Sequence, residues 1–304
     1  MKPFRIAHIV NPLTPPSNSD LHVAQPITLE SMIIARDFAS SKVEVELLST
    51  QFEEDTKVIP KEFTQTPNLE RSVLNLGDFE KSKKLPLIKD ILDRAVEISD
   101  AEYLIYTNID ITLVPHFYQA VASFIEKGHD AFMINRRRIP ATYSTKEELP
   151  LIWSEIGKPH PGFDCFVFSR ELYPKFELGN ICIGVPFIEA TIAHNLYAFA
   201  VNFKLFDELH LTTHIGMRVM NRYDDYYYWH NRNEFNEILG KIKPHLKAGA
   251  LPYSKEGFIK RTIKRGLNPS VFTKLALELE TKGFSDKAKY LLNEIRFTLL
   301  GPKR

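Results

Sequence analysis

The stretch Tyr103-Leu104-Ile105-Tyr106-Thr107-Asn108-Ile109-Asp110-Ile111 decides the fold class, because it joins a continuously apolar run to a carboxylate. Residues 103–107 are typical of a buried strand, since the run is short and uninterrupted. In an extended segment alternate side chains share a face, so Asn108 and Asp110 are expected to point the same way. An aspartate just past a strand end is a suitable ligand for Mg²⁺ or Mn²⁺, although such a triplet is equally typical of a turn.

Strands and helices alternate on both sides of this stretch. The alternation implies crossover connections and an α/β fold, with a mostly parallel sheet flanked by helices. Ligands of such sheets bind beyond the carboxyl ends of the strands. The predicted strands are residues 5–10, 43–48, 71–76, 103–107 and 131–134, and the predicted helices are residues 28–39, with Thr28 as N-cap, 85–98 and 117–126.

The alternation ends after Pro140. Strands are predicted at 163–168 and 203–211 and a helix at 186–199, and the remainder is nearly all helical, at 231–242, 255–265, 270–282 and 285–298. We therefore expect two units, an α/β domain over residues 1–222 and a helical C-terminal extension over residues 223–304.

Composition excludes several classes of protein. The chain has 304 residues, and 39 Lys and Arg against 38 Asp and Glu leave a net charge of +1, which argues against a nucleic-acid partner. Its two cysteines, Cys165 and Cys182, exclude a disulfide scaffold and a multi-cysteine zinc site. The first apolar run, residues 6–10, is too short for a secretory signal, and no run approaches a membrane span. We expect a cytoplasmic protein that meets any charged ligand locally.

The segment from Lys84 to Ile111 resembles the nucleotide-binding half of GT-A-type glycosyltransferases, of the nucleotide-diphospho-sugar transferase superfamily. In that family a strand ends in a short acidic motif, usually D-x-D, which holds a divalent ion and the diphosphate of the donor. Here the motif is degenerate, because Asn108 stands at the first acidic position and removes one formal charge. Three more segments follow in the family's order, at 160–170, 183–189 and 210–216.

The resemblance implies a hexosyltransferase-like enzyme that moves a sugar from a nucleotide-diphosphate donor to an acceptor hydroxyl of a glycan, a lipid-linked sugar or a small molecule. It implies that Asp110 and His214 bind Mn²⁺ or Mg²⁺ and the diphosphate. Glu189 or Asp164 would act as general base, and Glu189 is favoured because a helix start would hold it rigidly. The alternatives are a first-turn acid for Glu189, a buried carboxylate satisfied by backbone N–H groups for Asp164, and a structural histidine for His214.

The nucleotide would meet the ends of other strands. Asn11, Asp78 and Lys84 stand where a GT-A-type fold meets the base, ribose and phosphate, and Asn108 would bind the donor beside them. As alternatives, Asp78 is a turn residue and Lys84 a solvated one. The run 136–138 of three arginines either meets phosphate or is a solvated loop.

Two other functions use a related sheet. A nucleotidyltransferase would need a Gly-rich loop after the first strand, and residues 11–16 contain no glycine. A catalytically silent nucleotide-sugar-binding or scaffold protein is suggested by Asn108.

The predicted helix at 255–265 is basic and amphipathic. Lys260, Arg261, Lys264 and Arg265 accompany an apolar stripe. The pattern predicts either weak peripheral contact with an anionic membrane or a packed helix with a solvated basic face.

Overall fold

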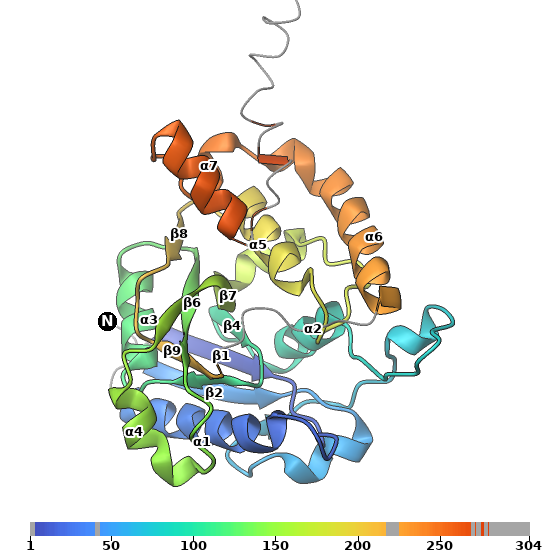
Figure 1. The fold of residues 1–304 in the computed structure, drawn as a ribbon, viewed down its shortest axis with the longest axis vertical. Helices are drawn as coiled ribbons and strands as arrows, with labels where there is room; N and C mark the ends of the chain where they lie inside the picture. Colours follow the sequence, from blue (N-terminus) through green and yellow to red (C-terminus); the bar gives the residue numbers. More distant parts are fainter. Residues whose placement is uncertain are drawn as a thin grey trace, which may run out of the picture.

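Nine strands form the sheet of the computed structural model, which describes residues 4–39, 43–216 and 225–268, together with 271, 275, 276 and 279 (Figure 1). The strands are β1 (Phe4–Val10), β2 (Val43–Ser49), β3 (Thr64–Gln65), β4 (Tyr103–Thr107), β5 (Ile111–Leu113), β6 (Ala131–Ile139), β7 (Lys158–Ser169), β8 (Phe203–Phe206) and β9 (Thr212–Ile215).

Seven α-helices lie within the described residues. They are α1 (Leu21–Ala39), α2 (Ile88–Ile98), α3 (Phe117–Glu126), α4 (Leu149–Ser154), α5 (Ile188–Phe199), α6 (Asp225–Ile242) and α7 (Phe258–Leu267). Short 3₁₀ helices are η1 (Glu53–Val58), η2 (Val73–Asn75), η3 (Lys146–Glu148), η4 (Arg170–Lys175), η5 (Lys243–His245) and η6 (Ala248–Ala250). None of the described helices is long and apolar enough to cross a bilayer.

The strand order is β3-β2-β1-β4-β7-β6-β9-β5, and β8 pairs with the free part of β6. Pairing is parallel between β1 and β2, β1 and β4, β2 and β3, β6 and β8, and β6 and β9. It is antiparallel where β7 lies between β4 and β6, and between β5 and β9. The predicted mostly parallel sheet flanked by helices is therefore confirmed.

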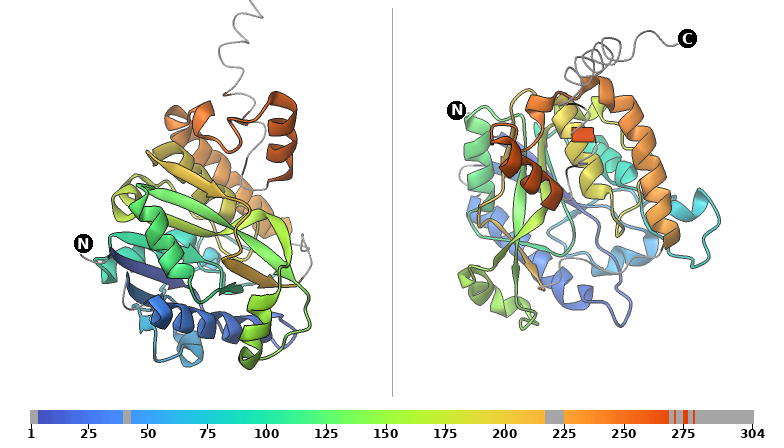
Figure 2. Two further views of the ribbon diagram at one scale, coloured as in Figure 1. Left: turned by 90° about the vertical axis from the view of Figure 1, so that its left-hand side faces the viewer. Right: turned by 45° about the horizontal axis from the view of Figure 1, so that its top comes forward.

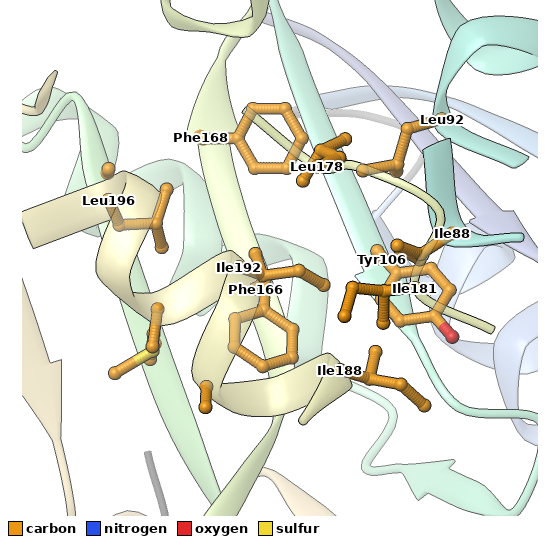
Figure 3. Packing of buried hydrophobic residues seen from close by; sticks show 14 of the residues in the cluster. Ile88, Leu92, Tyr106, Phe166, Phe168, Leu178, Ile181, Ile188, Ile192 and Leu196 are labelled. Atoms are coloured by element: carbon orange, nitrogen blue, oxygen red, sulfur yellow. The ribbon is translucent and has the colours of Figure 1, made fainter. Parts of the chain in front are cut away.

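Each face of the sheet has its own core, because successive side chains of a strand point to opposite faces. In β4, Leu104 and Tyr106 pack with α2, α5 and α6, whereas Ile105 packs with α1 and α3. Figure 2 shows these two helical layers. Figure 3 shows the first core, in which Tyr106 and Phe166 of β4 and β7 lie with residues of α5.

Four predictions about these elements are wrong in position or type. The predicted strand 71–76 contains η2 instead, because the Ser72 hydroxyl accepts a hydrogen bond from the Leu74 N–H, and the Asn75 side chain accepts one from the Ser72 N–H. The helix predicted from Thr28 begins at Leu21, since Gln25 is held by both backbone groups of Leu13.

The third error concerns the arginine run. Residues 136–138 lie within β6, where Arg137 and Arg138 pair with Thr213 and His214 of β9. The alternative of a solvated loop is therefore wrong, because β6 continues through these residues between β9 on one side and β7 on the other. The predicted strand 203–211 is likewise divided, and only its first part forms β8.

The structure describes only some of the C-terminal residues. The predicted boundary near residue 222 falls in 217–224, which lies outside the described residues, as do nearly all of the helices predicted at 270–282 and 285–298. Beyond that boundary, α6 packs with α5 through Phe235, Ile238 and Ile242 in the first core. The division into 1–222 and 223–304 stays a prediction.

Candidate functional site

Asn108 begins the turn that joins β4 to β5, and both the nitrogen and the oxygen of its side-chain amide make hydrogen bonds. Its Nδ2 donates to Asp164 Oδ1 at 2.8 Å, and its Oδ1 accepts from the Tyr106 hydroxyl at 3.0 Å. An aspartate at this position would place a second negative charge beside Asp164, and the two would repel. The amide converts that repulsion into a hydrogen bond, and this is a physical reason for Asn108 in the degenerate motif.

Asp110 meets His214 two residues further on. The strand β9 brings them together, because it pairs with β5 so that His214 lies opposite Ile111. Asp110 Oδ2 and His214 Nε2 are 3.1 Å apart. Burial by itself would raise the pKa of Asp110 and lower that of His214, but their hydrogen bond and mutual charge outweigh it, so the pKa of Asp110 is lowered and that of His214 raised.

The pair keeps two polar atoms without a partner. Asp110 Oδ1 and His214 Nδ1 are both buried and make no hydrogen bond in the described structure. Buried polar atoms are nearly always satisfied, so an unpaired carboxylate oxygen beside an imidazole indicates a place where a ligand can bind.

Asp164 lies at a β-bulge in β7. Cys165 pairs with Ile134 and Phe163 with Asn135, so Asp164 has no partner residue on β6. A bulge of this kind re-aims one side chain and is common beside active sites. The carboxylate of Asp164 consequently points away from the regular ladder.

Arg136 holds that carboxylate, with Nη1 at 2.8 Å from Asp164 Oδ2. The side chains of Arg136 and Asp164 are only 15% and 10% exposed. Burial nevertheless raises the pKa of Asp164, because the Arg136 guanidinium offsets only part of the cost of burying the charge and Asp110 adds to it. Asp164 is thus held by side chains, not by the backbone N–H groups of the alternative interpretation.

Glu189 stands in the first turn of α5 and faces the same bulged segment. Its Oε1 accepts the Phe163 N–H at 2.6 Å. The preceding residue, Phe187, adopts a left-handed φ of +85°, which turns the chain sharply into the helix. Gly162 leaves room for the carboxylate, since a Cβ there would lie 2.9 Å from Glu189 Oε2.

Sequence reasoning did not assign His160, which the structure adds to this group. Its Nε2 lies 3.1 Å from Arg136 Nη2, and its Nδ1 accepts the Gly162 N–H at 2.8 Å. No periodic pattern in the sequence predicts a role for His160. Its position follows from the register shifts between β7 and β6, which are a property of the sheet. We define the site cluster as Asn108, Asp110, Arg136, His160, Asp164, Glu189 and His214.

The three predicted nucleotide contacts have different surroundings. Asn11 is buried and donates to the Thr50 carbonyl at 2.6 Å, which ties the ends of β1 and β2 together. Lys84 pairs with Glu54 at 2.6 Å and lies over the Phe52 ring. Asp78 is exposed on a loop. Their assignment to the nucleotide stays a prediction.

Two side chains fit a divalent ion, although the described residues contain no group of three or more His, Cys, Asp and Glu side chains placed to hold one. Cis ligands of an octahedral Mg²⁺ with bonds of about 2.1 Å lie about 3.0 Å apart. The distance of 3.1 Å between Asp110 Oδ2 and His214 Nε2 is that of their hydrogen bond and is also close to this value, so an ion bound here would take the place of the shared proton. Water and phosphate oxygens would have to complete the shell, as is common for Mg²⁺.

Comparison with known proteins gives similarity to solved structures only. No family model and no curated protein matches the chain. S. aureus TarS 1–349 in complex with UDP-GlcNAc aligns over 99% of this chain and 93% of its own, at 11% identity and a TM-score of 0.44. M. tuberculosis glucosyl-3-phosphoglycerate synthase in complex with Mn²⁺ and UDP-Glc aligns over 79% of each chain, at 14% identity and a TM-score of 0.45.

Proposed function

We propose that this chain is a glycosyltransferase of GT-A type, which moves a sugar from a nucleotide-diphosphate donor to an acceptor hydroxyl. The observation that carries the proposal is the convergence of two kinds of carboxylate beyond the end of β4. Asp110 is paired with a histidine and keeps a free oxygen, whereas Asp164 and Glu189 come from the bulged strand and from α5. Glycosyl transfer needs a group that binds the departing diphosphate and another that accepts a proton.

Asp110 and His214 form the diphosphate end. They would hold Mn²⁺ or Mg²⁺, which supplies positive charge that stabilises the leaving group. Arg136 adds a second fixed positive charge close by, and its planar guanidinium suits phosphate oxygens. The positive charge of Arg136 thus lies in a site where the motif has one acidic residue fewer, because Asn108 is uncharged.

Glu189 is the better general base of the two predicted ones. One of its oxygens is fixed by the Phe163 N–H, and the side chain is carried by the first turn of a buried helix. Asp164 has one oxygen bonded to Asn108 and the other close to Arg136, so both of its oxygens already have partners within the site cluster. Asp164 instead orients Arg136 and contributes negative charge near the oxocarbenium-like sugar.

Calorimetry with a panel of nucleotide-diphosphate sugars, with and without Mn²⁺, tests the proposal. We expect the chain to bind at least one donor and to hydrolyse it slowly without acceptor, and Asp110→Asn to weaken binding at least tenfold. Asp90→Asn is the matched control, because Asp90 also pairs with a basic residue, Arg71, at 2.8 Å. Unchanged binding by Asp110→Asn, or equal loss in the control, would overturn the assignment.

Binding without any turnover would instead support the silent nucleotide-sugar-binding protein. One structural feature favours that second function, since the oxygen of Asn108 is already used by Tyr106 and leaves Asp110 as the one acid of the motif. Failure to bind any donor would remove both.

A further inference from the structure

The helix α7 leaves an apolar stripe uncovered. Of the twelve large hydrophobic residues that are exposed in the described structure, four belong to this ten-residue helix. Phe258 is 63% exposed, Ile259 75%, Ile263 57% and Leu267 68%. Ile259, Ile263 and Leu267 follow one another at intervals of four residues and so share one face.

The opposite face of α7 is held by the segment directly before the helix. Arg265 is buried and donates from Nε to the Pro252 carbonyl at 2.9 Å, and Arg261 donates to the Glu256 carbonyl at 2.8 Å. Beyond the helix, the Asn268 amide donates to the Tyr253 hydroxyl at 3.0 Å. Because these contacts hold one side, the stripe is directed outward, and Figures 1 and 2 show α7 at the outer edge of the molecule.

Positive charge is concentrated around this stripe. Residues 241–268 contain eight Lys and Arg and one acid, Glu256, which gives +7, whereas the whole chain carries +1. The remaining residues therefore carry −6. Lys260 and Lys264 flank the stripe and share one acid, Glu256, at 2.9 Å and 3.1 Å, and Lys241 pairs with Glu177 at 3.2 Å. The segment still contains one acid for eight basic residues.

We propose that α7 docks the protein on an anionic phospholipid bilayer, with the stripe in the acyl boundary and the lysines among the headgroups. The helix is about 15 Å long, too short to cross a bilayer and long enough to lie in its surface. Charge complementarity favours an anionic lipid surface, and the exposed apolar side chains favour lipid over a nucleic acid, which would meet only the cations. The inference does not depend on the proposed activity.

Flotation of the full chain with vesicles tests the proposal. We expect partition into phosphatidylcholine vesicles with about 30% phosphatidylglycerol, little partition into pure phosphatidylcholine, and loss of binding in high salt. The triple variant Ile259→Ser, Ile263→Ser and Leu267→Ser should reduce partition at least tenfold. The matched control is Leu151→Ser, Ile156→Ser and Val201→Ser, which removes three exposed apolar side chains elsewhere.

Labelling locates the contact. Both native cysteines are buried, so an environment-sensitive dye can be attached to Ile263→Cys, with Val201→Cys as control. A blue shift with anionic vesicles at position 263 alone supports the proposal. It is overturned if wild type does not float, if the control triple loses binding equally, or if the stripe variant binds normally. A stripe variant that changes only the oligomeric state, measured by sedimentation without lipid, would assign the face to a second copy instead.

Discussion

The two halves of the sheet differ in regularity. In the half formed by β3, β2, β1 and β4, which we call the parallel half, β1 and β2 pair without a break from Phe4 opposite Val43 to Val10 opposite Ser49. In the half formed by β7, β6, β9 and β5, the mixed half, the pairing of β6 with β7 shifts register twice between Ile134 and Arg137. The side chains that β7 contributes to the site cluster lie at these shifts. In an unbroken ladder alternate side chains point into the two cores. At a register shift a side chain leaves this alternation and can point into a site instead.

Two histidines show the same contrast. His8 in β1 has both ring nitrogens bonded, to the hydroxyls of Tyr118 and Thr107 at 2.9 Å each, and burial lowers its pKa to about 3. His214 in β9 keeps one nitrogen unpaired, and its pKa is raised by Asp110 in spite of burial. The parallel half thus holds a neutral structural histidine, and the mixed half holds a histidine whose protonated form is stabilised by Asp110.

The largest expected effect is on turnover in the mixed half. Glu189→Gln should lower turnover about a thousandfold, within the range for loss of a general base, with little change in melting temperature. Glu234→Gln is the control, because Glu234 also accepts a backbone N–H, from Asn180 at 2.8 Å, but lies on α6. Steady-state kinetics with the best donor measures both variants. Normal turnover by Glu189→Gln would show that the base lies elsewhere.

The second effect is on stability and compares an ion pair of the mixed half with one outside the sheet, between Arg71 and Asp90 of α2. Arg136→Met should destabilise the fold by about 3 kcal/mol, because it leaves the buried Asp164 charge unpaired. Adding Asp164→Asn should restore most of the loss. Arg71→Met breaks a more exposed pair with Asp90 and should cost about 1 kcal/mol or less. Urea unfolding measures the three variants, and equal costs at both sites would show that the ion pair in the mixed half has no special role in stability.

The third effect concerns acid and the parallel half. Because the folded-state pKa of His8 lies near 3, the unfolded chain takes up a proton that the folded chain refuses as pH falls below about 6.5. His8 should therefore lower stability by about 2 kcal/mol between pH 7 and pH 5. His8→Asn removes this contribution, so its unfolding free energy should fall less over that range. Parallel curves for wild type and variant would contradict the assignment.

The smallest effect separates packing from activity within the mixed half. The added Cβ of Gly162→Ala would lie 2.9 Å from Glu189 Oε2 and 3.0 Å from the His160 ring, so both side chains would have to shift. We expect roughly tenfold lower turnover and a change in stability below about 1 kcal/mol. Gly240→Ala meets nothing within 4 Å and lies in α6, so it should leave turnover unchanged and stabilise the helix by up to about 1 kcal/mol. A large loss of stability in Gly162→Ala would show a structural role instead.

Prediction from sequence succeeded best where the signal was local. The strand 103–107 and the helix 117–126 match β4 and α3, because a continuous apolar run and a clear helical period each specify one structure. Residues 71–76 misled the prediction because the Ser72 cap determines η2. The arginine run misled it because β9 extends the ladder of β6, and no local pattern reports a partner strand.

The sequence by itself determined the α/β alternation, the strand that ends at Asn108 and Asp110, and the amphipathic character of α7, since these depend on the order of neighbouring residues. Only the tertiary structure decided that His214 meets Asp110, that Asn108 and Arg136 hold Asp164, and that the stripe of α7 faces outward. Asn108 and Asp164 are 56 residues apart in the chain. Contacts at such separations follow from strand register and bulges, which come from the packing of the whole sheet.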